Sequence, residues 1–194
     1  MDKLKGYISE ITYKSPDSGY RVCRFMTDDD EETIVGTMPT IDEGEMLELS
    51  GEWTIHPIYG KQFKVTTYTA IEPEDEEAII RYLGSGLIRG VGPTLAKRIV
   101  AEFGRESFKV IEEQPERLAR IKGITMRKAQ EIGVLMHEKR GYREAMMFLQ
   151  KYGIGNNLAI KIYSVYHDRI YTIIEENPYK IAEDINGIGF KTAD

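Results

Sequence analysis

The sequence has little of several residue types and patterns, and each shortage excludes a class of protein. Its 194 residues contain one cysteine, Cys23, so an internal disulfide framework is excluded and a reducing, cytoplasmic compartment is expected. The apolar runs are only a few residues long, too short to span a bilayer. The charged residues 1–6 lack the apolar stretch of a secretory signal. The three histidines lie far apart in the sequence, without the spacing of a zinc site.

The charges that are present are divided unevenly along the chain. Residues 1–77 contain 7 Lys and Arg against 18 Asp and Glu, a balance of −11. Residues 78–194 contain 19 against 14, a balance of +5. A basic half favours contact with nucleic acid, whereas an acidic half repels the phosphates of a bound strand.

The first part of the chain has the pattern of a small β-domain. Alternating side chains and turns rich in Pro, Gly and Asp predict strands over about 4–13, 20–26, 33–36, 45–55 and 62–71. Five short strands in this length favour a five-stranded OB-type barrel over residues 1–75, with Cys23 and Trp53 in its core. The charged residues 72–77 mark the expected boundary, and Asp75 or Pro73 is expected to start the first helix.

An internal repeat dominates residues 76–194, for which we predict an all-α tandem helix-hairpin-helix array. Four segments within 104 residues share Gly, an apolar residue, Gly and, four residues later, Ala. These segments are Gly90-Val91-Gly92 with Ala96, Gly123-Ile124-Thr125 with Ala129, Gly153-Ile154-Gly155 with Ala159, and Gly187-Ile188-Gly189 with Ala193. The second segment departs from the pattern, with Thr125 in place of the second Gly.

A longer repeat encloses the short one. Gly90 and Gly153 lie 63 residues apart, as do Ile111 and Ile174, which each begin an Ile-Glu-Glu-(Gln/Asn)-Pro motif. The array is therefore predicted to be a duplicated pair of hairpins. Residues 137–149 are expected to form an added helix between the pairs, and the last hairpin is cut short at residue 194.

Each position of the hairpin has an expected role in binding phosphate. The first Gly permits a left-handed turn, and the second lets a phosphate approach the open amides and positive dipole of the next helix. Such contacts do not read sequence. The candidate DNA-binding residues are Gly90, Val91, Gly92, Thr94, Lys97, Arg98, Gly123, Arg127, Lys128, Gly153, Ile154, Gly155, Asn156, Asn157, Lys161, Gly187, Gly189, Lys191 and Thr192. Thr125 marks the weakest unit. In the competing interpretation, the glycines serve only tight turns.

The order of these parts resembles a known family. A barrel containing the segments 44–53 and 56–63, followed by duplicated hairpins and by residues 186–194, is similar to the N-terminal region of RecD-like, exodeoxyribonuclease V alpha-type DNA helicases that act without RecB and RecC. The resemblance implies an ATP-driven motor that moves 5′ to 3′ on single-stranded DNA, with ATP and Mg bound there. It also implies a role in DNA repair and recombination. This chain would then be a fragment without the motor.

No catalytic, metal or cofactor site is predicted within these 194 residues. The segment 187–192 resembles a nucleotide phosphate loop, but Phe190 separates Gly189 from Lys191, and no buried β-strand precedes it. The acidic residues 28–32 are expected to form a solvated loop rather than a metal site. No pair of nucleophile and base stands out.

Two functions from different classes remain open. The first is a non-sequence-specific DNA-binding region of a helicase, acting on single-stranded or forked DNA. The second is a scaffolding module that docks on the motor or on a repair or replication protein, for which the acidic barrel is better suited than for DNA. A junction-binding protein is a third interpretation, which the third and fourth hairpins disfavour.

Overall fold

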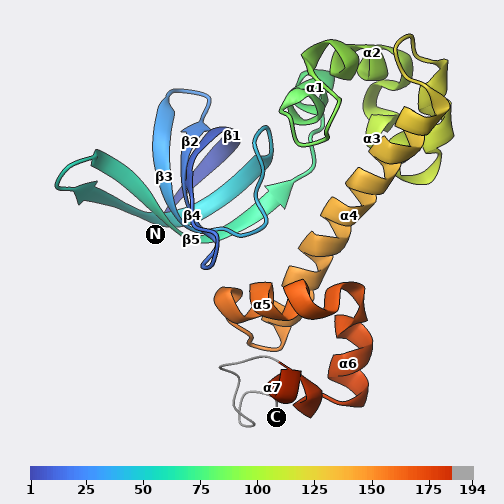
Figure 1. Ribbon diagram of the computed structural model, residues 1–194. Helices are drawn as coiled ribbons and strands as arrows, with labels where there is room; N and C mark the ends of the chain where they lie inside the picture. Colours follow the sequence, from blue (N-terminus) through green and yellow to red (C-terminus); the bar gives the residue numbers. More distant parts are fainter. Residues whose placement is uncertain (185–194) are drawn as a thin grey trace.

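The computed structural model describes residues 1–184 and confirms the predicted fold class, a five-stranded barrel followed by helices (Figure 1). The strands are β1 (Asp2–Lys14), β2 (Tyr20–Met26), β3 (Glu31–Thr37), β4 (Met46–His56) and β5 (Gly60–Ile71). Their order around the barrel is β1-β2-β3-β5-β4, and β1 pairs with both β2 and β4. A parallel pairing of β3 with β5 completes the closure, so the sheet has no free edge at this point.

The barrel core is built from alternate residues, with one interruption that the sequence pattern did not reveal. Cys23 is fully buried, as expected, and Trp53 is only partly buried against the core. In β5, strict alternation predicts that Val65 and Tyr68 point to opposite faces of the sheet. The β4–β5 register instead skips a residue between Val65 and Thr67, which forms a bulge. Val65 and Tyr68 therefore both pack against the core, which corrects the predicted facing of Tyr68.

From Asp75 onward the described chain is helical. The carboxylate of Asp75 accepts a hydrogen bond from the Ala78 amide at 2.7 Å, so this residue rather than Pro73 caps the first helix. The helices are α1 (Glu76–Gly84), α2 (Pro93–Phe103), α3 (Ser107–Glu113), α4 (Met126–Lys151), α5 (Asn156–Tyr166), α6 (Ile170–Glu176) and α7 (Tyr179–Asp184), with 3₁₀ segments at Gly104–Glu106, Pro115–Arg120 and His167–Arg169. No helix in residues 1–184 is long and apolar enough to cross a membrane.

Helix α4 corrects the expectation of an added helix over residues 137–149. These residues belong to one continuous helix of 26 residues that begins in the second hairpin and ends at the third. Its first half packs into a core with α1, α2 and α3, through residues such as Ile132 and Met136. Its second half packs into another core with α5 and α6, through residues such as Met146 and Leu149. The helix therefore spaces two helical lobes apart (Figure 1).

The 63-residue repeat of the sequence is a structural repeat. Helix α2, the following 3₁₀ turn and α3 have 11, 3 and 7 residues, and α5, its 3₁₀ turn and α6 have the same lengths. The residue that ends the first helix of each unit has nearly the same backbone conformation. Gly104 has φ 55° and ψ −132°, and His167 has φ 48° and ψ −131°. His167 is thus the one described non-glycine residue with a positive φ.

Replacing His167 with Gly is expected to stabilise the fold by about 1 kcal/mol. A side chain in this sparsely populated region costs about 1–3 kcal/mol, and the greater freedom of glycine in the unfolded chain offsets part of the gain. The reciprocal change, Gly104→His, is expected to destabilise the fold. Urea unfolding of both variants measures the two effects, and shifts of the same sign in both would contradict the equivalence of the two positions.

The barrel contacts the helices through the loop between β3 and β4. The buried carboxylate of Glu45 pairs with Arg143 of α4, and Asp42 accepts a hydrogen bond from Lys139 at 2.9 Å. These contacts fix the barrel against the middle of α4, where that helix runs between the two lobes (Figure 1).

Candidate nucleic-acid interface

The first two hairpins lie against each other in a reciprocal arrangement. A methyl group placed on Gly90 would lie 3.4 Å from Cε of Lys128, and one placed on Gly123 would lie 3.6 Å from Cδ2 of Leu95. Lys128 and Leu95 hold the same position in their hairpins, five residues after the first Gly. The two turns are therefore related by an approximate two-fold axis and form one unit over a shared core.

The turns have the geometry that their sequence requires. The first glycines have φ values of 86°, 95° and 74° in hairpins one to three, a region that favours glycine. The middle residues Val91 and Ile124 are buried beneath their turns, and Ile154 is partly buried. The alanines Ala96, Ala129 and Ala159 are fully buried where the following helices pack closely.

The second glycine is required by neither the backbone nor the packing. Gly92 and Gly155 cap α2 and α5 with φ values of −99° and −65°, which any residue adopts. A methyl group at either position would meet no atom of residues 1–184 within 4 Å. Neither residue supplies a side-chain acceptor, so no side chain of the capping residue closes the amides of the first helical turn, to which Pro93 of α2 contributes no N–H. In the second hairpin, Thr125 takes the place of this glycine. Its hydroxyl accepts a hydrogen bond from the Lys128 backbone amide at 3.2 Å and so caps the start of α4.

The structure separates the predicted basic contacts into two groups. Arg98 donates a hydrogen bond to the Lys122 carbonyl at 3.0 Å, so it holds the second turn in place, and Arg127 pairs with Glu131. Lys97 and Lys161 are exposed and make no ion pair within residues 1–184.

The polar contacts predicted at the helix starts are likewise of different kinds. The Asn156 side-chain oxygen accepts a hydrogen bond from the side-chain amide of Gln150 at 2.7 Å, whereas Thr94 and Asn157 are exposed. The predicted contacts of the fourth hairpin lie outside the described residues; they are Gly187, Gly189, Lys191 and Thr192.

Two further cations belong to this surface. Arg89 and Lys122 directly precede the first Gly of hairpins one and two, and both side chains are exposed. Within residues 1–184 neither forms an ion pair. The sequence carried a signal for them, because both hold the same position in the repeat. The predicted contacts lie within or after the turns, whereas these two residues precede them and were missed.

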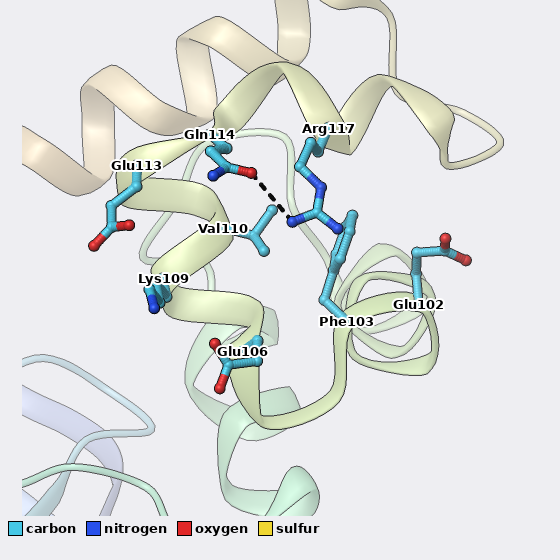
Figure 2. Close-up of a pocket in the computed structure, with 8 residues that line it drawn as sticks. All are labelled: Glu102, Phe103, Glu106, Lys109, Val110, Glu113, Gln114 and Arg117. Atoms are coloured by element: carbon cyan, nitrogen blue, oxygen red, sulfur yellow. Dashed lines mark hydrogen bonds between the residues drawn. The ribbon is translucent and has the colours of Figure 1, made fainter.

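Residues 1–184 contain no group of three His, Cys, Asp or Glu side chains that could hold a metal ion. A hollow of about 300 Å³ beside α3 is lined by Glu102, Phe103, Glu106, Lys109, Val110, Glu113, Gln114 and Arg117 (Figure 2). Its charged side chains spread over the rim, and Arg117 donates to Gln114 at 3.2 Å. These residues include no cysteine, serine or histidine that could act as a nucleophile or its base.

Comparison with known proteins accounts for nearly the whole chain. Residues 1–73 match the family described as the OB-fold domain of the ATP-dependent DNA helicase YrrC. Residues 81–132 match a SAM-like tandem helix-hairpin-helix family, and residues 138–194 match the helix-hairpin-helix domain of the ATP-dependent RecD2 DNA helicase.

A curated relative matches this chain over almost its whole length. The ATP-dependent RecD2 DNA helicase of Deinococcus radiodurans is 26% identical over 200 residues, which cover 99% of this chain and 28% of that protein. The chain thus spans less than a third of the relative's length. In the order of its OB-fold and helix-hairpin-helix domains, the chain is similar to the N-terminal region of the RecD-like DNA helicases.

Proposed function

We propose that the helical part of this chain binds the DNA backbone without reading its sequence, as the DNA-binding region of a RecD-like helicase. The observation that carries the proposal is the pair Gly92 and Gly155. Both leave the start of a helix open and uncapped at an exposed turn, although neither backbone nor packing requires glycine there. A phosphate is the ligand that such amides and the positive end of the helix dipole accept.

The charges around the paired hairpins support this proposal. Arg89, Lys97 and Lys122 are exposed near the two turns and unpaired within residues 1–184, and the half of the chain that holds them carries +5. Cations at these positions attract phosphates whatever the base sequence. Hairpins one and three are the stronger expected contacts, because Thr125 occupies an amide of the second.

The activity of the whole polypeptide is part of the same proposal. The relative is named an ATP-dependent DNA helicase, and this chain covers 28% of it. By this likeness we assign ATP-driven movement from 5′ to 3′, with ATP and Mg bound in a motor region. We also assign a role in DNA repair and recombination. The segment described above would hold single-stranded or forked DNA for that motor.

Salt titration tests the DNA-binding proposal. If three phosphates are held, raising the salt from 50 to 200 mM is expected to lower affinity about 40-fold on duplex DNA, because counterions are released on binding. Fluorescence anisotropy on single-stranded, double-stranded and forked oligonucleotides of two unrelated sequences measures it. Equal affinity for the two sequences is expected. Absence of binding at 50 mM salt would refute the proposal.

A second candidate function is protein docking through the barrel, favoured by the tip of the β4–β5 hairpin. Ile55, Ile58 and Tyr59 are 84%, 79% and 74% exposed there, and the hairpin projects away from the helices (Figure 1). The His56 Nδ1 atom accepts hydrogen bonds from the Ile58 and Tyr59 amides, which holds the turn. Exposed apolar side chains on an acidic barrel suit a protein partner better than a phosphate backbone. Capture of a protein without any shift of oligonucleotides would favour this function.

A further inference from the structure

A cavity of about 260 Å³ lies between the barrel and the helices. Its walls come from the end of β1, the turn before β2, the loop between β3 and β4, helix α4 and, through Ile160, helix α5. The polar side chains that line it are those of Lys14, Ser15, Arg21, Thr40, Asp42, Lys139 and Tyr142. The cavity is separate from the hairpin turns, none of whose glycines lines it.

The charges around this cavity do not balance. Lys14, Arg21 and Lys139 are three cations, and Asp42 is the one carboxylate among the lining residues. Asp42 pairs with Lys139 at 2.9 Å. Lys14 makes no ion pair within residues 1–184. Burial lowers the pKa of Lys14, and the nearby Arg21 lowers it further, whereas Asp42 opposes the shift.

Arg21 differs from the other two cations, because it is buried and has no carboxylate partner among residues 1–184. Its side chain is buried, with 4% exposed. Its two terminal nitrogens donate to the carbonyl oxygens of Ile41 and Pro39, and its Nε has no hydrogen-bond partner in the described part of the chain. Backbone carbonyls satisfy donors but do not cancel the charge, and a buried charge without a counter-ion is costly.

We propose that this cavity binds a phosphate group. A dianion would cancel the excess of two positive charges, and Lys14, Lys139, Ser15 and the Tyr142 hydroxyl supply donors around it. The phosphate belongs either to a DNA backbone that passes between the barrel and α5, or to a free phosphate or nucleotide. The inference goes beyond the proposed function, because it places an anion site beside the acidic barrel and holds without the hairpin contacts.

Titration of the 194-residue chain with inorganic phosphate tests this site. Calorimetry at constant ionic strength, with chloride as the balancing anion, is expected to show saturable binding. Lys14→Gln and Tyr142→Phe are each expected to weaken it about tenfold, the size of one charge-assisted hydrogen bond. Lys5→Gln, an exposed change on the same strand, is the matched control and should bind as the parent does. Lack of saturable binding, or equal binding by Lys14→Gln and Lys5→Gln, would overturn the proposal.

Oligonucleotides in the same titration identify the source of the phosphate. If the DNA backbone enters the cavity, phosphate competes with DNA and Lys14→Gln weakens both ligands. If the ligand is free phosphate, Lys14→Gln weakens phosphate binding alone. Either result supports the site. A chain that binds phosphate but no oligonucleotide would retain this site and refute the DNA-binding function, so the two failures are distinguishable.

Discussion

Replacing both Gly92 and Gly155 with Asp is expected to lower DNA affinity on the order of 100-fold and to stabilise the fold. Each new carboxylate can accept hydrogen bonds from the open amides of its helix, which stabilises each site by about 0.5–1 kcal/mol. The same carboxylate occupies the place of a phosphate and repels it. Each lost charge-assisted contact accounts for about a tenfold loss of affinity. Binding and stability therefore change in opposite directions.

Anisotropy and urea unfolding on the same preparations measure these two effects. Thr125→Asp is the matched control, because that helix start already carries a side-chain cap. Little change in stability and a smaller loss of affinity are expected for it. If the double variant bound DNA as the parent does, the open amides would not be phosphate contacts, and the glycines would serve the turns alone. A loss of stability would mean that the space beside these glycines is needed for folding.

Replacing Arg143 with Met is expected to destabilise the chain by about 3 kcal/mol at pH 8 and by much less at pH 5. Glu45 is 3% exposed, and Arg143 is its ion-pair partner across the barrel–helix contact. Removing one partner of a buried pair leaves an uncompensated charge at pH 8. At pH 5 the carboxyl of Glu45 holds a proton, because burial raises its pKa to about 7 although Arg143 opposes the shift.

The same shift predicts how the parent chain responds to pH. The usual pKa of Glu45 is 4.5, and its pKa in the folded chain is about 7. At a pH between these two values, Glu45 is protonated in the folded chain and ionised in the unfolded chain. The stabilisation of the folded chain by this proton is therefore fully present below pH 4.5 and is lost as the pH rises to 7. Glu45→Gln should remove this dependence, worth about 2 kcal/mol between pH 5 and pH 8.

Urea unfolding at pH 5 and pH 8 checks both expectations. Arg140→Met is the matched control on the same helix, because Arg140 pairs with Glu112 and Glu144 at the surface. Exposed pairs contribute less than about 1 kcal/mol, so this variant should differ little from the parent at either pH. A similar loss of stability at pH 8 in both Arg variants would show that the Glu45–Arg143 pair contributes no more than a surface pair.

Much of the fold could be predicted from local patterns. The five strands, a start of the first helix at Pro73 or Asp75 and the 63-residue repeat followed from alternation, capping residues and spacing. Such features are recorded locally, because side-chain periodicity and special backbone angles depend on neighbours in the sequence. The turn glycines Gly90 and Gly153 were identified for the same reason.

The candidate site was predictable only in part. Its turns and helix starts were located, and their contact with DNA stays a prediction. The roles of single cations were not, since the exposed Arg98 donates a hydrogen bond to the Lys122 carbonyl of the second turn. Arg89 and Lys122 were missed because they precede the turns, whereas the predicted contacts lie within or after them.

The sequence by itself determined the barrel, the hairpin turns and their duplication. Only the tertiary structure decided that α4 is one continuous helix, that the first two hairpins pair reciprocally and that Glu45 lies against Arg143. The physical reason is the range of the interactions. Backbone geometry and amphipathic period are set within a few residues, whereas the partner of a buried charge or of a packed turn comes from a distant segment, which folding alone brings into contact.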